Sequence, residues 1–201
     1  MKSFSTLLLS LLLLGGSIQA QDGQKPAFRE AGETMISLQG LRLYSTRELN
    51  TPYPILPANN LQISIAKFHK PQKMRGLKIG YGSYLGDAAV IPRVEGTTLS
   101  AVAFMRGYRG TKRLSVFSET SIGTDRQFVS STNNLPEGNR IWWDVYLQSS
   151  FGLDARIGKR LGVEGSIGVR AGTDNYFTND ELAFKFRVVS NVGINYFFNR
   201  N

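Results

Sequence analysis

The chain has no cysteine and only one histidine, His69, among its 201 residues. Without cysteine, no disulfide framework, thiolate metal site or cysteine nucleophile can form. A lipid anchor on a cysteine that follows an export signal is excluded for the same reason. Carboxylates remain as metal ligands, and no cluster of Asp and Glu has the spacing of a calcium-binding loop.

Long hydrophobic runs are also scarce. The single clear run, Leu7 to Leu14, is about half the length of roughly 20 residues that a transmembrane helix needs. Lys2 precedes it, and Ala20 ends the segment before polar residues begin. This pattern predicts a signal peptide over residues 1–20, cleaved after Ala20, although Ile18 stands where a small residue is usual.

A strong positive charge does not identify a nucleic-acid partner here. The chain has 24 basic and 15 acidic residues, and loss of residues 1–20 removes only Lys2. Basic proteins often bind nucleic acid. An exported protein whose positive charges are not gathered in one patch does not fit that class, so we expect no nucleic-acid partner.

After residue 21, apolar and polar residues alternate with the period of β-strands, and sustained helical periodicity is absent. For example, Val145 and Leu147 alternate with Asp144 and Tyr146. Eight such segments can be identified, at 35–44, 61–66, 77–82, 99–106, 113–119, 143–151, 161–170 and 184–198. They predict an all-β fold over residues 34–198, an eight-stranded antiparallel up-and-down barrel whose apolar parity faces lipid.

The connections between these segments alternate in length. Residues 46–59, 86–97, 123–140 and 172–182 form long polar connections, whereas 69–74, 109–112 and 155–159 are short. A barrel in the bacterial outer membrane has long loops outside and tight turns in the periplasm. This order predicts a periplasmic N-terminal segment at 21–33, the barrel at 34–198 and a C-terminal tail at 199–201.

Charge follows the same division. Basic residues gather at the short connections: His69, Lys70, Lys73, Arg75, Arg109, Lys112, Arg113, Arg156, Lys159 and Arg160. Many acids lie in the long ones: Glu95, Asp125, Glu137, Asp174, Asp180 and Glu181. Two explanations stay open, which are attraction to the phosphates of the inner leaflet and the general frequency of Lys and Arg in turns.

The last segment, Val188 to Phe198, alternates apolar residues and ends on aromatic ones. It resembles the closing strand of small outer-membrane barrels, although Asn199, Arg200 and Asn201 follow where that family usually ends. Over about residues 34–198 the architecture is similar to the OmpA-like and OmpX-like barrels. The resemblance implies outer-membrane lipid as the environment, and recognition of the C-terminal strand by the barrel-insertion machinery.

No catalytic, cofactor-binding or metal-binding residue is predicted. A lipid-modifying esterase of the outer membrane would need a Ser-His pair near the outer rim, and His69 lies in a predicted turn at the other end. Asp174, Asp180 and Glu181 fit a solvated loop better than a cation site. The Gly80-Tyr81-Gly82 segment and Gly162, Gly165 and Gly168 lie in predicted strands with no following helix, so they do not form a phosphate loop.

The polar parity carries charges of both signs: Lys78, Arg113, Glu119, Asp144, Glu164, Arg170, Lys185 and Arg187. An eight-stranded barrel has an interior only wide enough for side chains. We therefore expect a paired network that fills the barrel rather than an open pore.

These patterns favour a non-enzymatic outer-membrane barrel with a structural, surface-binding or envelope-machine role, through loops that include Ser130, Ser131, Asn133, Asn134 and Gly138. An extracellular or envelope protein is then a possible partner. The alternative is a soluble periplasmic or secreted lipocalin-like barrel that binds an apolar ligand. It requires the opposite assignment of faces, with the apolar parity inside. A lipid-modifying enzyme is the third and least supported hypothesis.

Overall fold

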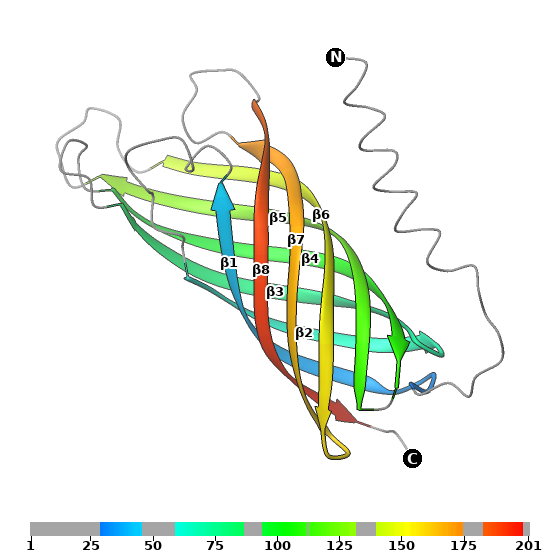
Figure 1. The fold of residues 1–201 in the computed structure, drawn as a ribbon. Coiled ribbons are helices and arrows are strands. Elements are labelled where there is room, and N and C mark those ends of the chain that lie inside the picture. Colours follow the sequence, from blue (N-terminus) through cyan, green and yellow to red (C-terminus); the bar gives the residue numbers. More distant parts are fainter. Residues whose placement is uncertain are drawn as a thin grey trace, which may run out of the picture.

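A computed structural model describes residues 29–45, 59–86, 94–111, 113–131, 140–174 and 183–198. The described chain forms eight strands in sequence order, and they close into one barrel (Figure 1). The strands are β1 (Thr34–Ser45), β2 (Asn59–Lys70), β3 (Lys73–Gly86), β4 (Val94–Gly110), β5 (Leu114–Ser131), β6 (Arg140–Ile157), β7 (Leu161–Asp174) and β8 (Ala183–Phe198). The predicted fold class, a closed eight-stranded antiparallel barrel, is confirmed.

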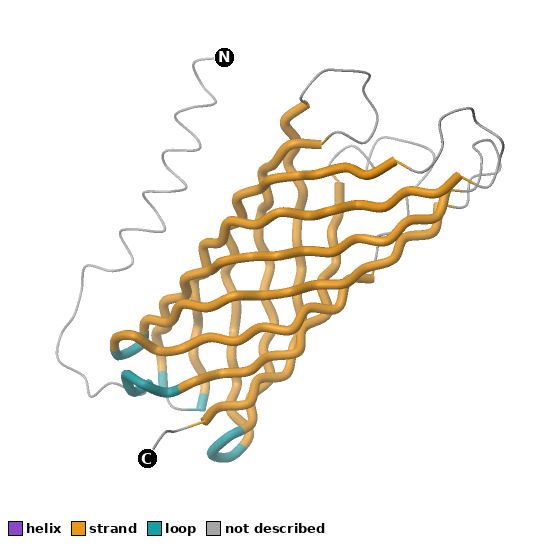
Figure 2. The backbone as a smooth tube through the Cα atoms, turned by 180° about the vertical axis from the view of Figure 1, so that it is seen from behind, coloured by secondary structure: helices purple, strands orange, loops and turns teal. Residues whose placement is uncertain are grey.

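Each strand pairs antiparallel with the next along the chain, and β1 pairs with β8 to close the sheet. That closing ladder runs from the pair of Thr34 with Phe198 to the pair of Ser45 with Arg187. Closure satisfies the backbone of the first and last strands and leaves no open edge. The strands are tilted steeply against the barrel axis, as the view from behind also shows (Figure 2).

The two ends of the barrel differ. At the turn end, which we define by the connections β2–β3, β4–β5 and β6–β7, the strands are joined by only a few residues. Gln72 and Gly158 have positive φ values of 62° and 78° there, which suits tight hairpin turns. The opposite end, here called the loop end, carries the long connections. Their residues 46–58, 87–93, 132–139 and 175–182 lie outside the described residues.

The strands extend further toward the loop end than the alternation predicts. The predicted connection 123–140 is wrong in its bounds, because β5 continues to Ser131 and β6 begins at Arg140. Thr124 and Arg126 occupy the outward parity in this stretch and interrupt the apolar signal. Their backbones nevertheless continue the ladder, opposite Val145 and Trp143, since pairing depends on a neighbouring strand rather than on apolar side chains.

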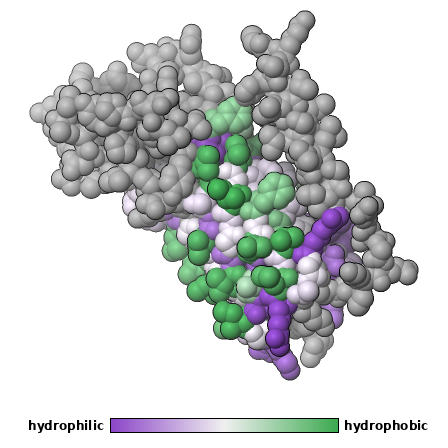
Figure 3. All heavy atoms as spheres, viewed as in Figure 1, coloured by the Kyte–Doolittle hydropathy of each residue, from purple (hydrophilic) through white to green (hydrophobic). Residues whose placement is uncertain are grey.

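The two parities of the strands face opposite environments. Large apolar side chains are exposed on the outer face of every strand for which side chains are described: Ile79 is 70% exposed, Val192 68% and Ile63 57%. Figure 3 shows these apolar groups across one face of the barrel, with polar groups at the turn end. Buried positions are mostly polar or charged. The predicted assignment of faces is confirmed, and it is the reverse of what a lipocalin-like barrel requires.

A soluble monomer rarely exposes so much contiguous apolar surface. Among the residues that the structure describes, no helix is long and apolar enough to cross a membrane.

Introducing arginine on the outer face of the barrel tests this assignment of faces. Val145 is 55% exposed and Ile167 is 62% exposed, and both point outward. If these positions face lipid, Val145→Arg or Ile167→Arg should lower the free energy of unfolding by about 2–4 kcal/mol. Denaturant titration of the protein folded into phospholipid vesicles measures this loss.

Two further variants serve as comparisons for the outward arginines. Asn134→Ala, outside the described residues, should leave the unfolding free energy unchanged. Ser166→Arg adds bulk to the inward parity and should destabilise by overfilling the barrel. Outward arginines as harmless as the loop change would contradict the assignment of faces.

Candidate functional site

The interior of the barrel, called the lumen below, is the most chemically distinctive part of the described structure. Alternation directs every second residue of each strand inward, and the inward set includes charged side chains from β3 to β8. Burial of an unpaired charge costs several kcal/mol, so each of these groups needs a partner. Their partners can be followed in three tiers from the middle of the lumen to its ends.

Arg106 of β4 is the centre of the middle tier. Its guanidinium donates to Glu119 of β5, with Nε 2.9 Å and Nη2 2.6 Å from Oε2, and Nη1 lies 2.5 Å from Oε2 of Glu164 of β7. The Tyr108 hydroxyl is 3.1 Å from Nη1. The guanidinium also lies 3.9 Å from the centre of the Phe117 ring, a distance typical of a cation–π contact.

Both carboxylates of this tier have further donors. Lys78 Nζ of β3 lies 2.5 Å from Oε1 of Glu119. Glu164 accepts hydrogen bonds from Gln39 of β1 and from Asn195 of β8, the latter at 2.8 Å. The middle tier therefore joins β1, β3, β4, β5, β7 and β8 across the lumen.

At the turn end, the segment before β1 enters the lumen. Arg29 is only 1% exposed and forms an ion pair with Asp154 of β6. Its guanidinium lies 4.4 Å from the centre of the Phe197 ring and 5.1 Å from that of Tyr108. Two backbone hydrogen bonds hold this segment against β2: Gly32 N–H donates to Phe68 O, and Phe68 N–H to Glu33 O.

A second ion pair supports this entry. Arg156 Nη2 lies 2.6 Å from Oε1 of Glu33, and its guanidinium is 4.0 Å from the centre of the Phe197 ring. Apolar side chains fill the space around these charges in one buried cluster: Met35, Ala66, Phe68, Met74, Phe104, Tyr108, Phe117 and Phe197. The turn end of the lumen is thus closed by aromatic rings, paired charges and the N-terminal segment together.

The third tier lies closer to the loop end. Arg170 Nη1 of β7 lies 2.8 Å from Oδ2 of Asp125 of β5, and its Nε donates to Gln148 at 3.2 Å. The guanidinium is 3.7 Å from the centre of the Tyr146 ring. A cavity of about 10 Å³ bounded by Asp125, Asp144, Arg170 and Arg187 is near the lower limit for one water molecule.

Glycine makes room for the inward rings. Gly123 stands opposite Tyr146 in the β5–β6 ladder, and a Cβ atom added to it would lie 2.6 Å from atoms of that ring. Gly152 stands in the same way opposite Phe117. Gly80 and Gly82 stand in the same way against inward side chains, because an added Cβ would collide with Ser100 and Asn60, and glycine in a strand often marks such a close approach.

The described lumen charges balance. The buried acids are Glu33, Glu119, Asp125, Asp144, Asp154 and Glu164, and the buried bases are Arg29, Lys78, Arg106 and Arg170. Arg156 and Arg187 are half-buried and add two positive charges. Six positive and six negative groups are therefore brought together, as expected for charges that must be neutralised away from water.

Most of the inward charges were predicted correctly. Lys78, Glu119, Asp144, Glu164 and Arg170 are all buried in the lumen. The prediction that Arg113 points into the lumen is wrong. Its side chain is exposed in the β4–β5 turn, because the alternation does not extend into the turn. The side chain of Lys185 lies outside the described residues.

Four important lumen residues were absent from the predicted inward charges. Arg106 is one of them, at the end of its predicted segment 99–106. Asp125 is buried although it was placed in a loop, because polar outward neighbours hid the continuation of β5. Asp154 lay at the border of a predicted turn, and Arg29 in a segment with no alternation. Their pairing with distant strands leaves no local signal in the sequence.

His69, the residue weighed for catalysis, does not lie in the lumen. His69 is exposed at the turn end of β2, among basic neighbours that include Lys70 and Lys73. Within the described ranges, no group of three or more His, Cys, Asp and Glu side chains is arranged to hold a metal ion. Asp180 and Glu181, weighed with Asp174 as a weak cation site, lie outside the described residues, as does the side chain of Asp174.

No protein-family model matches the chain, and no curated protein matches it in sequence. Several solved structures match in fold. The outer-membrane protein OprG from Pseudomonas aeruginosa has a TM-score of 0.61 at 10% identity, covering 86% of this chain and 98% of its own. Ail, the attachment invasion locus protein of Yersinia pestis, has a TM-score of 0.55 at 12% identity, covering 84% and 99%.

The N-terminal β-barrel domain of Pseudomonas aeruginosa OprF is a third match, with a TM-score of 0.52 at 14% identity, covering 85% of this chain and all of that one. These matches are proteins of the bacterial outer membrane, which supports the predicted location. At such low identities the likeness concerns the fold alone. The chain has the fold of the small eight-stranded barrels of bacterial outer membranes.

Proposed function

We propose that the protein spans the bacterial outer membrane as a closed, non-enzymatic barrel, whose lumen is filled and whose loop end presents a binding surface at the cell exterior. The observation that carries this proposal is the division of the strands: large apolar side chains outside, and a balanced set of paired charges inside. Such a division suits a protein with lipid around it and no water path through it.

The orientation follows from the connections. The turn end would face the periplasm, because short turns and both ends of the barrel chain lie there. The loop end would then carry the four long connections outward, where they can contact an extracellular or envelope protein. Ail, a neighbour in fold, is named for attachment and invasion and is also known in complex with a heparin analogue. That supports a surface-binding role for this scaffold.

The closing strand, β8, is the subject of a second proposal. β8 exposes Val192, Ile194 and Phe198 on its outer face, and it pairs with β1 to complete the barrel. We propose that this strand is the part of the chain that the barrel-insertion machinery recognises.

Membrane location can be tested by cell fractionation together with gel migration. The protein should be found in the outer-membrane fraction and should migrate differently in SDS before and after boiling, as a closed barrel resists unfolding until heated. A mature protein that stays monomeric in plain buffer, without detergent, would refute the membrane location.

A filled lumen predicts the absence of a steady ion current. Purified protein inserted into planar bilayers should leave the conductance at the level of the bare membrane, since paired side chains occupy the path. Stable current steps that scale with the amount of inserted protein would contradict the closed lumen.

The lumen charges predict a difference between two substitutions. Glu119→Gln removes the carboxylate shared by Lys78 and Arg106 and leaves buried positive charge under-compensated, so the free energy of unfolding should fall by about 3–5 kcal/mol. Lys78→Met should cost less, because Glu119 keeps Arg106. Denaturant titration in vesicles compares the two variants, and an equal or reversed order would show that Arg106 does not depend on Glu119.

A further inference from the structure

A groove with a volume of about 740 Å³ lies on the outer face of the barrel near the turn end. This volume is within the range of roughly 300–1,000 Å³ typical of ligand pockets. Among the residues that line it, Met105, Val116, Phe151 and Leu153 are exposed on the outward parity. The groove therefore opens toward the surroundings of the barrel. Met74, Arg106, Tyr108 and Phe117, which are buried on the inward parity of the same strands, also border it.

The floor of the groove results from two small residues in one cross-strand row. This row runs from Lys73 of β3 through Gly107 of β4 and Ser118 of β5 to Phe151 of β6. Where neighbouring rows carry larger side chains, Gly107 and Ser118 leave the backbone uncovered. The result is a trough flanked by apolar side chains, which include Met105, Val116 and Leu153.

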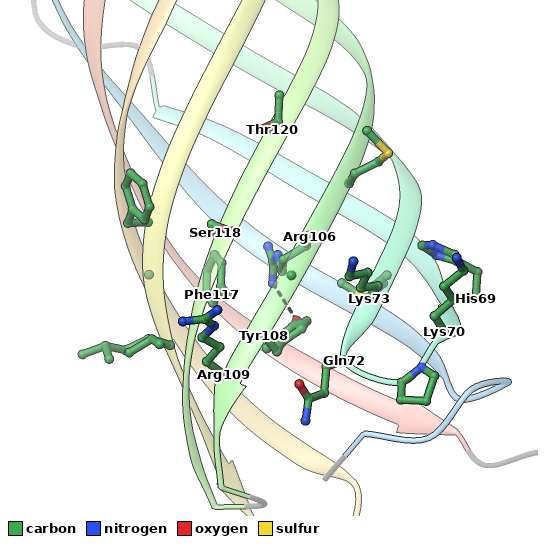
Figure 4. A pocket seen from close by; sticks show the side chains of 18 residues that line it. His69, Lys70, Gln72, Lys73, Arg106, Tyr108, Arg109, Phe117, Ser118 and Thr120 are labelled. Carbon is green, nitrogen blue, oxygen red and sulfur yellow. Dashed lines mark hydrogen bonds between the residues drawn. The ribbon is translucent and has the colours of Figure 1, made fainter. Parts of the chain in front are cut away.

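The turn end of the groove is positively charged. Lys70, Lys73 and Arg109 line it with exposed side chains. Figure 4 shows Lys70 and Lys73 on one side of the groove and Arg109 on the other, with Thr120 further along β5. No carboxylate is among the eighteen described residues that line the groove.

We propose that this groove binds an anionic phospholipid of the periplasmic leaflet, with its phosphate between Lys73 and Arg109 and one acyl chain along Gly107 and Ser118. The inference rests on the proposed membrane location. Positive charges at the level of the headgroups attract phosphate, and an apolar trough beside them suits the attached chain. A second copy of the protein would bring a second set of the same positive charges, which disfavours it as the occupant.

Two glycine variants test the trough. Gly107→Leu should fill it, and the added Cβ would meet only Ser118 Oγ, at 3.8 Å. Gly40→Leu is the matched control, because Gly40 is also outward and its added Cβ would meet only Val192 O, at 3.8 Å. In native mass spectrometry of the purified full chain with phosphatidylglycerol, Gly107→Leu should weaken lipid binding about tenfold or more, and Gly40→Leu should bind like the wild type.

The charges are tested separately, which keeps the proposal open to refutation if Gly107→Leu does not fold. Lys73→Gln combined with Arg109→Gln should weaken binding of phosphatidylglycerol about tenfold, since each basic group near the headgroups adds severalfold affinity. Arg113→Gln with Lys159→Gln removes the same charge from exposed turn positions outside the groove and should have little effect. Phosphatidylethanolamine, which has no net charge, should bind more weakly than phosphatidylglycerol.

Any of three outcomes would overturn the proposal. The first is binding of phosphatidylglycerol by Gly107→Leu that is as tight as that of the wild type, and the second is equal binding of phosphatidylglycerol and phosphatidylethanolamine by both the wild type and the charge variant. The third is a dimer of the wild type that Gly107→Leu abolishes. Heat-modifiable migration of every sample separates this failure from that of the membrane location. Wild-type protein without such migration contradicts the location, whereas normal migration with unchanged lipid affinity in the variants contradicts the groove alone.

Discussion

The structure depends on Arg106, a buried cation held between two carboxylates. Glu119 reaches it from the neighbouring strand β5 and Glu164 from β7 across the lumen, and removal of either would leave charge uncompensated in a place that water scarcely enters. Because those carboxylates also accept from Lys78, Gln39 and Asn195, the same cluster ties six of the eight strands together. The buried apolar cluster lies near the turn end, so in the rest of the lumen the polar network has to supply the cohesion that an apolar core gives a soluble protein.

The outer face follows a different rule. Its side chains are selected for the solvent around them and not for one another, which is why large apolar groups remain exposed on neighbouring strands. The interior sets which strands lie opposite each other, and the exterior sets where the barrel can reside. The small residues of the trough, Gly107 and Ser118, depart from this rule on the outer face. The space that these two small residues leave distinguishes this part of the outer face from the rest, and it is where we propose that a phospholipid binds.

Alternation in the sequence was enough to predict the strand number, the closed topology and the face of most residues, because a period of two records which side of a sheet is buried. It failed where both faces are polar: Thr124 and Arg126 concealed the length of β5, and with it the burial of Asp125. It could not identify Arg29, whose partner lies 125 residues away. The groove was equally out of reach, since it arises from the register of four strands and not from any one segment.

The contact between Arg29 and Asp154 bears on the order in which the chain can assemble. Arg29 precedes the first strand, yet its carboxylate partner belongs to the sixth, and its nearest ring, Phe197, belongs to the last. Contacts between such distant parts of a chain form late, since everything between them must first be brought into place. The pairing of Arg29 with Asp154 and its contact with the Phe197 ring can therefore form only when β6 and β8 are in place, although backbone hydrogen bonds join the same segment to β2. Docking of Arg29 would then be a late step, which takes place once the barrel is complete.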